Sequence, residues 1–119
     1  MFVEHSDWQL ANVGLPPRTA FEAHVSPHDR AMLRDLAHRV VEIGHLPVMA
    51  ERRALWKRHN ALERVRPMLL VFPEGAWREL LPGSTMRCQG YRARACESAL
   101  RQAIYQNEHL RDDTVIEPR

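Results

Sequence analysis

The chain has 119 residues and a formal net charge of +2, and 45% of its residues are hydrophobic. This length fits one domain or part of a larger one, and this hydrophobic fraction is higher than disordered chains have. No window approaches the ~20 consecutive apolar residues that a membrane-spanning helix needs, and the N-terminus lacks the basic and apolar regions of a signal peptide. We therefore expect a folded protein of the cytoplasm, without a membrane segment.

The charged residues indicate an ordinary solvated surface. The basic residues are arginines except for Lys57, and acidic residues are interleaved with them. The densest basic stretch, residues 51–66, is interrupted by Glu51 and Glu63, whereas nucleic-acid binding needs basic residues gathered on one side. Binding of RNA or DNA therefore ranks third among the functional hypotheses.

Cysteine and histidine spacing predicts no metal site. Cys88 and Cys96 are too few for a disulfide framework, and their spacing fits no common zinc motif. The seven histidines form no His-Glu-x-x-His or His-x-Cys motif. Cys96 falls on the apolar face of a predicted helix and is expected to be buried, while Cys88 lies nearer a turn.

The N-terminal part of the chain divides into an arm and a first helix. Residues 1–25 show no sustained period, and Gly14-Leu15-Pro16-Pro17 forbids a continuous helix, so we expect an extended arm. Residues 26–119 form the folded region. It opens with Ser26 as an N-cap and Pro27 at the first helical position, and an apolar stripe then predicts a helix over residues 27–44.

A second helix and a strand are expected next. Apolar and small residues at helical spacing predict a helix from residue 47 to about residue 63, packed back on the first as a hairpin. Residues 68–72 are an unbroken apolar run between Pro67 and Pro73. Such a run is typical of a strand buried on both faces, as in parallel sheets.

The remaining residues complete a predicted βαβ unit. Residues 75–81 fit a short helix, residues 91–110 a long helix with small residues on one face, and residues 114–116 a second strand. Strand, helix and strand in this order make parallel neighbours. The predicted fold class is therefore α/β, a helical hairpin followed by a βαβ unit and mostly helical by residue count, whose two strands need a partner to complete the sheet.

Two acids follow the predicted strands and are the candidate catalytic residues. Glu74 comes after the first strand and Glu117 after the second. Because the carboxyl ends of parallel strands form the ligand face, we expect both carboxylates in one region, with Trp77 and Arg78 as substrate-binding neighbours. The structural alternatives remain open: Glu74 as a helix cap and Glu117 as a solvated residue near a frayed end.

Six segments, taken in order, resemble the N-terminal portion of the uroporphyrinogen decarboxylase-like proteins, in the branch related to corrinoid-dependent methyltransferases. They cover much of residues 30–118: 33–43 (LRDLAHRVVEI), 53–62 (RALWKRHNAL), 66–70 (RPMLL), 76–80 (AWREL), 105–110 (YQNEHL) and 115–118 (VIEP).

The resemblance implies the first part of a (β/α)8 barrel whose N-terminal helices pack outside. It places residues 74–78 and Glu117 at the mouth of the active site. The decarboxylases carry an arginine-rich segment after their first strand, which Pro73-Glu74-Gly75-Ala76-Trp77 lacks, and this argues against porphyrinogen decarboxylation. The methyltransferases bind zinc through residues of their C-terminal half, so zinc or a corrinoid is expected only in a complete family protein.

Two main hypotheses follow. The chain is the N-terminal segment of such a barrel protein, contributes to a pocket at the barrel mouth and is not catalytic alone; its partners are then the remainder of the barrel and a corrinoid protein. Alternatively, it is a small interaction protein that forms a homo-oligomer or binds a full-length barrel relative, because an exposed sheet edge needs cover.

Overall fold

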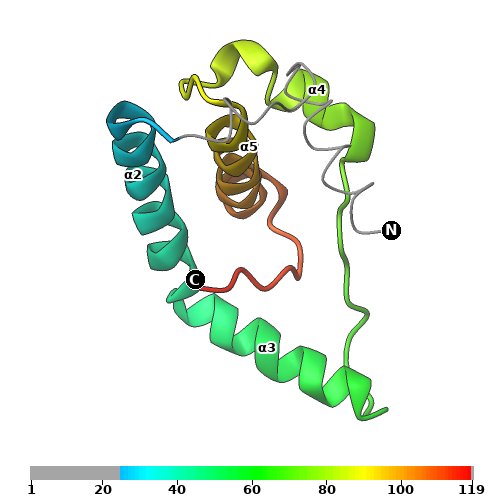
Figure 1. The fold of residues 1–119 in the computed structure, drawn as a ribbon. Helices are drawn as coiled ribbons and strands as arrows, with labels where there is room; N and C mark the ends of the chain where they lie inside the picture. The colour runs from blue at the N-terminus through cyan, green and yellow to red at the C-terminus, as the bar shows by residue number, and fades with distance from the viewer. Residues whose placement is uncertain (1–24, 119) are drawn as a thin grey trace. The chain divides into compact units, whose positions relative to one another are not determined.

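The computed structural model describes residues 25–118, and these are mainly helical (Figure 1). They fall into two compact units along the chain, one made of residues 25–36 and 73–102 and the other of residues 37–72 and 103–118. The expected extended arm of residues 1–25 lies, except for Val25, outside the described residues.

Helix α2 spans Pro27–Gly44, as the sequence predicts. Ser26 Oγ accepts a hydrogen bond from the backbone N–H of Asp29 at 3.1 Å, and Pro27 occupies the first helical position, where no N–H partner is needed. The local sequence therefore fixes where this helix begins.

Helix α3 spans Pro47–Asn60, slightly shorter than predicted. Lys57, Arg58 and His59 lie in its last turn, where cations stabilise the partial negative charge of a helix C-terminus. The chain then leaves the helix through Leu62, whose φ is +62°. The expected hairpin is not formed, since α3 leads away from the C-terminal half of α2 (Figure 1).

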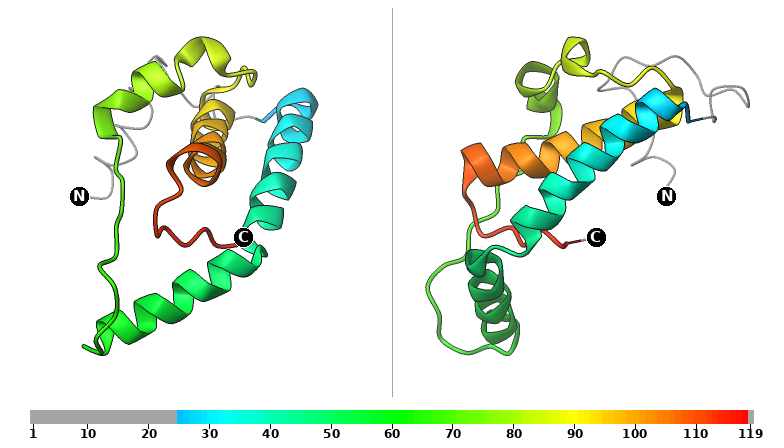
Figure 2. Two further views of the ribbon diagram at one scale, coloured as in Figure 1. Left: turned by 180° about the vertical axis from the view of Figure 1, so that it is seen from behind. Right: turned by 90° about the vertical axis from the view of Figure 1, so that its left-hand side faces the viewer.

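The second half of the chain contains one long helix preceded by short ones. A 3₁₀ turn, η2 (Glu74–Ala76), continues into α4 (Trp77–Leu80), and a second 3₁₀ turn is η3 (Gly83–Thr85). Helix α5 spans Tyr91–Tyr105 and ends in one π-helical turn, η4 (Gln106–Leu110), which confirms the predicted helix over residues 91–110. Figure 2 (right) shows the N-terminal ends of α2 and α5 close together, where a carboxylate of α2 bonds the backbone just before α5.

The predicted α/β class with a βαβ unit is wrong. Within residues 25–118 the structure contains no strand and no sheet. The first predicted strand is bonded by the residue just before the second one, because the backbone N–H of Asp113 donates to the carbonyl of Leu69 at 2.8 Å. This single bond is not followed by a ladder.

Two physical reasons explain the failed strand prediction. The run of residues 68–72 was expected to be buried on both faces, but Leu69 and Phe72 are exposed, so its apolar character does not report burial in a sheet. The side chains of Asp112 and Asp113 also occupy the backbone N–H groups of Val71 and Leu69, which a strand would give to a neighbouring carbonyl.

Each unit has its own small set of buried apolar residues. In the unit containing α4 and most of α5 they are Trp77, Met86, Cys88, Tyr91 and Ala93. In the other unit they are Val40, Ile43, Met49 and Ile116. Cores this small leave much of the ordering of the non-helical segments to polar contacts.

The C-terminal segment of the chain packs closely on the end of α2. A Cβ atom placed on Gly44 would lie 2.6 Å from the backbone nitrogen of Pro118, closer than real side chains approach a backbone atom. Only glycine therefore fits at this position without moving the segment that carries Pro118.

None of the helices within the described ranges is both long and apolar enough to cross a membrane.

Candidate functional site

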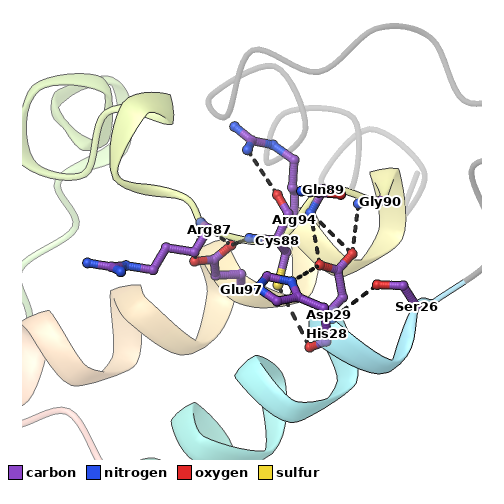
Figure 3. A network of polar contacts seen from close by, with 9 residues as sticks. All are labelled: Ser26, His28, Asp29, Arg87, Cys88, Gln89, Gly90, Arg94 and Glu97. Atoms are coloured by element: carbon purple, nitrogen blue, oxygen red, sulfur yellow. Dashed lines mark hydrogen bonds and ion pairs between the residues drawn. The ribbon is translucent and has the colours of Figure 1, made fainter.

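The unit that contains most of α5 is organised around a buried glutamate, Glu97. Its carboxylate accepts the backbone N–H groups of Arg87, at 3.0 and 2.8 Å, and of Cys88, at 2.8 Å (Figure 3). Arg101, one turn further along α5, donates its Nε–H to the same carboxylate at 2.8 Å. Glu97 therefore holds the loop before α5 against the helix, and the guanidinium of Arg101 neutralises its charge.

Asp29 of α2 holds the next two residues of the same loop. Its carboxylate accepts the backbone N–H of Gln89, at 3.0 and 3.1 Å, and that of Gly90 at 2.8 Å (Figure 3). His28 Nδ1 lies 3.2 Å from the same group. Four successive backbone N–H groups, residues 87–90, thus end on two buried carboxylates.

Arg94 secures the carbonyl side of this loop. It donates to the carbonyl of Cys88 at 3.1 Å, as Figure 3 shows, and to that of Gly83 at 3.0 Å. All four N–H groups of residues 87–90 and the carbonyl of Cys88 are therefore bonded to side chains, although the loop belongs to no helix or sheet.

The thiol of Cys88 lies inside this network and is not a nucleophile at neutral pH. Burial raises its pKa to about 12, and the neighbouring Glu97 and Asp29 carboxylates act in the same direction. Cys96, which was expected to be buried, is exposed instead. The prediction of a buried Cys96 is therefore wrong, and the buried cysteine is Cys88.

In the other unit the carboxylate of Asp113 likewise bonds a backbone N–H group outside the helices. Its carboxylate accepts the N–H of Leu69 at 2.8 Å and two guanidinium bonds from Arg66, at 2.7 and 3.0 Å. The Asp113 N–H in turn donates to the Leu69 carbonyl. Both backbone groups of Leu69 are thereby tied to this one residue.

Asp112 bonds Val71, which lies two residues after Leu69 in the run of residues 68–72. Its carboxylate accepts the N–H of Val71 at 2.7 Å and the hydroxyl of Thr114 at 2.9 Å. Gln106 donates to the Val71 carbonyl at 3.1 Å, so both backbone groups of Val71 are also bonded.

Helix α3 fixes the opposite side of the 112–116 segment. Trp56 Nε1 donates to the carbonyl of Asp113 at 2.8 Å, and Arg52 donates to that of Thr114 at 3.1 Å. Residues 112–114 are therefore held between α3 and the run of residues 68–72.

The four buried carboxylates act as hydrogen-bond acceptors and not as proton acceptors. Burial raises the pKa values of Asp29, Glu97 and Asp112, but the bonds from backbone N–H groups outweigh burial and leave each pKa below its ordinary value. The Arg66 hydrogen bonds lower the pKa of Asp113 to about 2. General acid–base catalysis near neutral pH needs a pKa close to the working pH, which none of these groups has.

The predicted site residues Glu74, Trp77, Arg78 and Glu117 do not lie at a sheet edge, because residues 25–118 form no sheet. Glu74 is exposed, has a φ of +49° and is the first residue of η2, whose N-cap is Pro73. Trp77 is buried and Arg78 is exposed. Glu117 is exposed, belongs to the other unit and lies 3.4 Å from Arg53. Their predicted convergence rested on parallel strands that the described structure lacks.

Sequence reasoning missed the roles of the buried acids. The sequence patterns predicted no contact between Asp29, Asp112 or Asp113 and a segment distant in the chain. A usable signal lay at Glu97, an acid four residues after the small Ala93 and four before Arg101, on a helix otherwise predicted to face a core.

The run of residues 68–72 carries the most conspicuous exposed apolar surface of the described chain. The exposed fractions are 63% for Leu69, 39% for Leu70 and 70% for Phe72. Leu62, also exposed, lies outside this run. Clustered exposed apolar side chains mark interaction surfaces more often than single ones do.

Neither metal coordination nor comparison adds a second candidate site. Across residues 25–118, no three His, Cys, Asp or Glu side chains are arranged to hold a metal ion. Comparisons with protein-family models, curated proteins and solved structures gave no match. The candidate site is therefore the exposed run of residues 68–72 together with the carboxylates that hold it.

Replacing the buried Glu97 with glutamine should destabilise the fold. Glutamine has no negative charge to pair with Arg101, and its NH₂ group would face backbone N–H donors. Because Glu97 is fully buried, we expect the free energy of unfolding to fall by an amount on the order of 3 kcal/mol. Urea unfolding followed by circular dichroism measures the change. Glu108→Gln, which breaks the exposed pair with Arg39, is the matched control and should cost far less. Equal losses for the two variants would contradict the assigned role of Glu97.

Stability should fall in acid. The four carboxylates have lower pKa values in the folded chain than in the unfolded one, so the unfolded chain binds more protons as the pH drops. Their contribution to the free energy of unfolding is complete above the ordinary carboxyl pKa values. It is lost as the pH falls through the pKa values of the folded chain, which reach about 2 at Asp113. Urea midpoints should therefore decrease from about pH 5 downward, and less steeply in Asp113→Asn. Midpoints that stay constant from neutral to strongly acidic pH would contradict this.

Proposed function

We propose that the chain is a non-catalytic association module that self-associates through the run of residues 68–72. The observation that carries this proposal is the exposure of Leu69, Leu70 and Phe72 on a segment whose backbone is already ordered by Asp112 and Asp113. An ordered apolar segment loses little conformational freedom when it binds.

The energetics favour covering this run. Complete burial of a leucine or phenylalanine side chain contributes roughly 1.5–3 kcal/mol relative to leaving it in water. Leu69 and Phe72 are both mostly exposed, so a partner surface would gain most of that amount from each. Self-association is the simplest source of such a surface.

The chemistry of the described residues supports association over catalysis. The buried carboxylates are occupied by backbone donors and have lowered pKa values, and the Cys88 thiol has a raised one. Both Cys88 and Cys96 are free, which fits the reducing cytoplasm in which we place the protein.

Removing the apolar character of the run should abolish self-association. Light scattering across a concentration series should give a mass that rises above the monomer for the wild-type chain and stays monomeric for Phe72→Lys. A lysine at this exposed position is tolerated by the fold but not in an apolar interface.

Leu62→Lys is the matched control, because Leu62 is 93% exposed but lies outside the run. It should associate like the wild-type chain. A wild-type chain that is monomeric at every concentration, or equal effects of the two lysines, would overturn the proposal.

A second candidate is that the chain is the N-terminal segment of a uroporphyrinogen decarboxylase-like protein of the methyltransferase type, contributing to its pocket and inactive alone. The favouring observation is that four of the segments carrying the resemblance are joined in pairs by side-chain bonds. Arg39 of residues 33–43 donates to Glu108 of residues 105–110 at 2.8 Å, and Arg53 of residues 53–62 donates to Glu117 of residues 115–118 at 3.4 Å. In this candidate a catalytic barrel, with any zinc and the corrinoid protein, covers residues 68–72.

This candidate predicts that the chain restores activity to a family barrel that lacks its own N-terminal segment. With Glu74 and Glu117 as catalytic residues, Glu74→Gln or Glu117→Gln should lower methyl transfer in the reconstituted complex by about 100-fold or more. Glu79→Gln, an exposed acid of α4, is the control and should not change it. Absence of binding to the barrel, or unchanged activity in both variants, would contradict the candidate.

A further inference from the structure

The two edges of the run of residues 68–72 differ in their hydrogen bonding. Leu69 and Val71 have both their N–H and their C=O groups bonded, to Asp113 and to Asp112 and Gln106 respectively. In an extended chain the backbone groups of alternate residues point to opposite edges. The odd-numbered edge of the run is therefore filled.

The even-numbered edge offers the same groups without internal partners. Among residues 25–118, nothing bonds the backbone N–H or C=O of Leu70 or of Phe72. Both side chains are exposed as well. An extended segment with one paired edge and one open edge is the arrangement that accepts an added strand.

The sequence around this edge is nearly symmetric about Leu70. The apolar run is preceded by Arg66-Pro67 and followed by Pro73-Glu74. When two copies lie antiparallel with Leu70 opposite Leu70, Met68 faces Phe72 and each proline faces the other proline. Each apolar residue of one run then faces an apolar residue of the other, so a second copy of this chain matches the run along its whole length.

We propose that two copies of the chain associate by antiparallel strand addition, with the even-numbered edges of residues 68–72 paired about a two-fold axis at Leu70. The inference rests on the self-association proposed above and specifies its geometry. Leu70 pairs with Leu70, and Met68 with Phe72, as hydrogen-bonded pairs that exchange both backbone bonds.

The prolines and the carboxylates fit this register. Pro67 and Pro73 are odd-numbered, so their missing N–H groups fall on the edge away from the second copy and remove no bond from the new ladder. Asp112 and Asp113 hold the run extended before the partner arrives, which lowers the entropy lost on association.

Cross-linking through one exposed cysteine, with Cys88 left buried, tests the register. In a Cys96→Ser background, Leu70→Cys should form a disulfide-linked dimer under mild oxidation, because hydrogen-bonded antiparallel pairs place Cα atoms about 5.5 Å apart. Leu69→Cys should not link to itself, because its two copies lie two residues apart along the strands. A mixture of Leu69→Cys and Val71→Cys should link, since these residues face each other.

The outcomes separate the two proposals. If the wild-type chain is monomeric by light scattering, both the self-association and its register are wrong. If it dimerises but Leu69→Cys links to itself as readily as Leu70→Cys, or Leu70→Cys fails to link while remaining dimeric under reducing conditions, only the register is wrong.

Backbone amide exchange in the wild-type chain gives a measurement without substitutions. Exchange of the Leu70 and Phe72 amides should slow at least about tenfold as the dimer forms, while the Leu69 and Val71 amides stay protected at every concentration. Concentration-independent exchange at Leu70 and Phe72 in a chain that does dimerise would overturn the strand pairing.

Discussion

The hydrogen bond from a loop N–H to a buried carboxylate is the interaction on which both units of this chain depend. Glu97 and Asp29 hold residues 87–90 in one unit, and Asp113 and Asp112 hold Leu69 and Val71 in the other. Helices bond their own backbone groups, but these segments do not, and a buried N–H without a partner is costly. The carboxylates supply the missing acceptors, so segments outside helices are ordered without a sheet.

The same arrangement links the structure to the proposed function. Asp112 and Asp113 bond residues 68–72 from one side. Among residues 25–118 nothing bonds the backbone of Leu70 or Phe72, and both side chains are exposed. A carboxylate that accepts several backbone bonds is also a poor base, so in the proposed function these acids order a surface for association instead of transferring protons.

How much of this was predictable from sequence depends on whether the signal was local. Ser26 and Pro27 fix the start of α2 within the helix itself, and that prediction is confirmed. The apolar run of residues 68–72 was read as a buried strand, because composition shows a tendency to extend but not what covers the segment. The backbone partners of Glu97 are ten and nine residues away and the partners of Asp113 more than forty, and no periodicity encodes such pairs. The predicted roles of Glu74 and Glu117 depended on the sheet and therefore remain proposals.

Backbone amide exchange at residues 87–90 tests most directly whether buried carboxylates order the loops. The account predicts that the amides of Arg87, Cys88, Gln89 and Gly90 exchange as slowly as those inside α5, although the loop belongs to no helix or sheet, and that their protection disappears in Glu97→Gln and Asp29→Asn. Rapid exchange of these amides in the wild-type chain while α5 remains protected would contradict it.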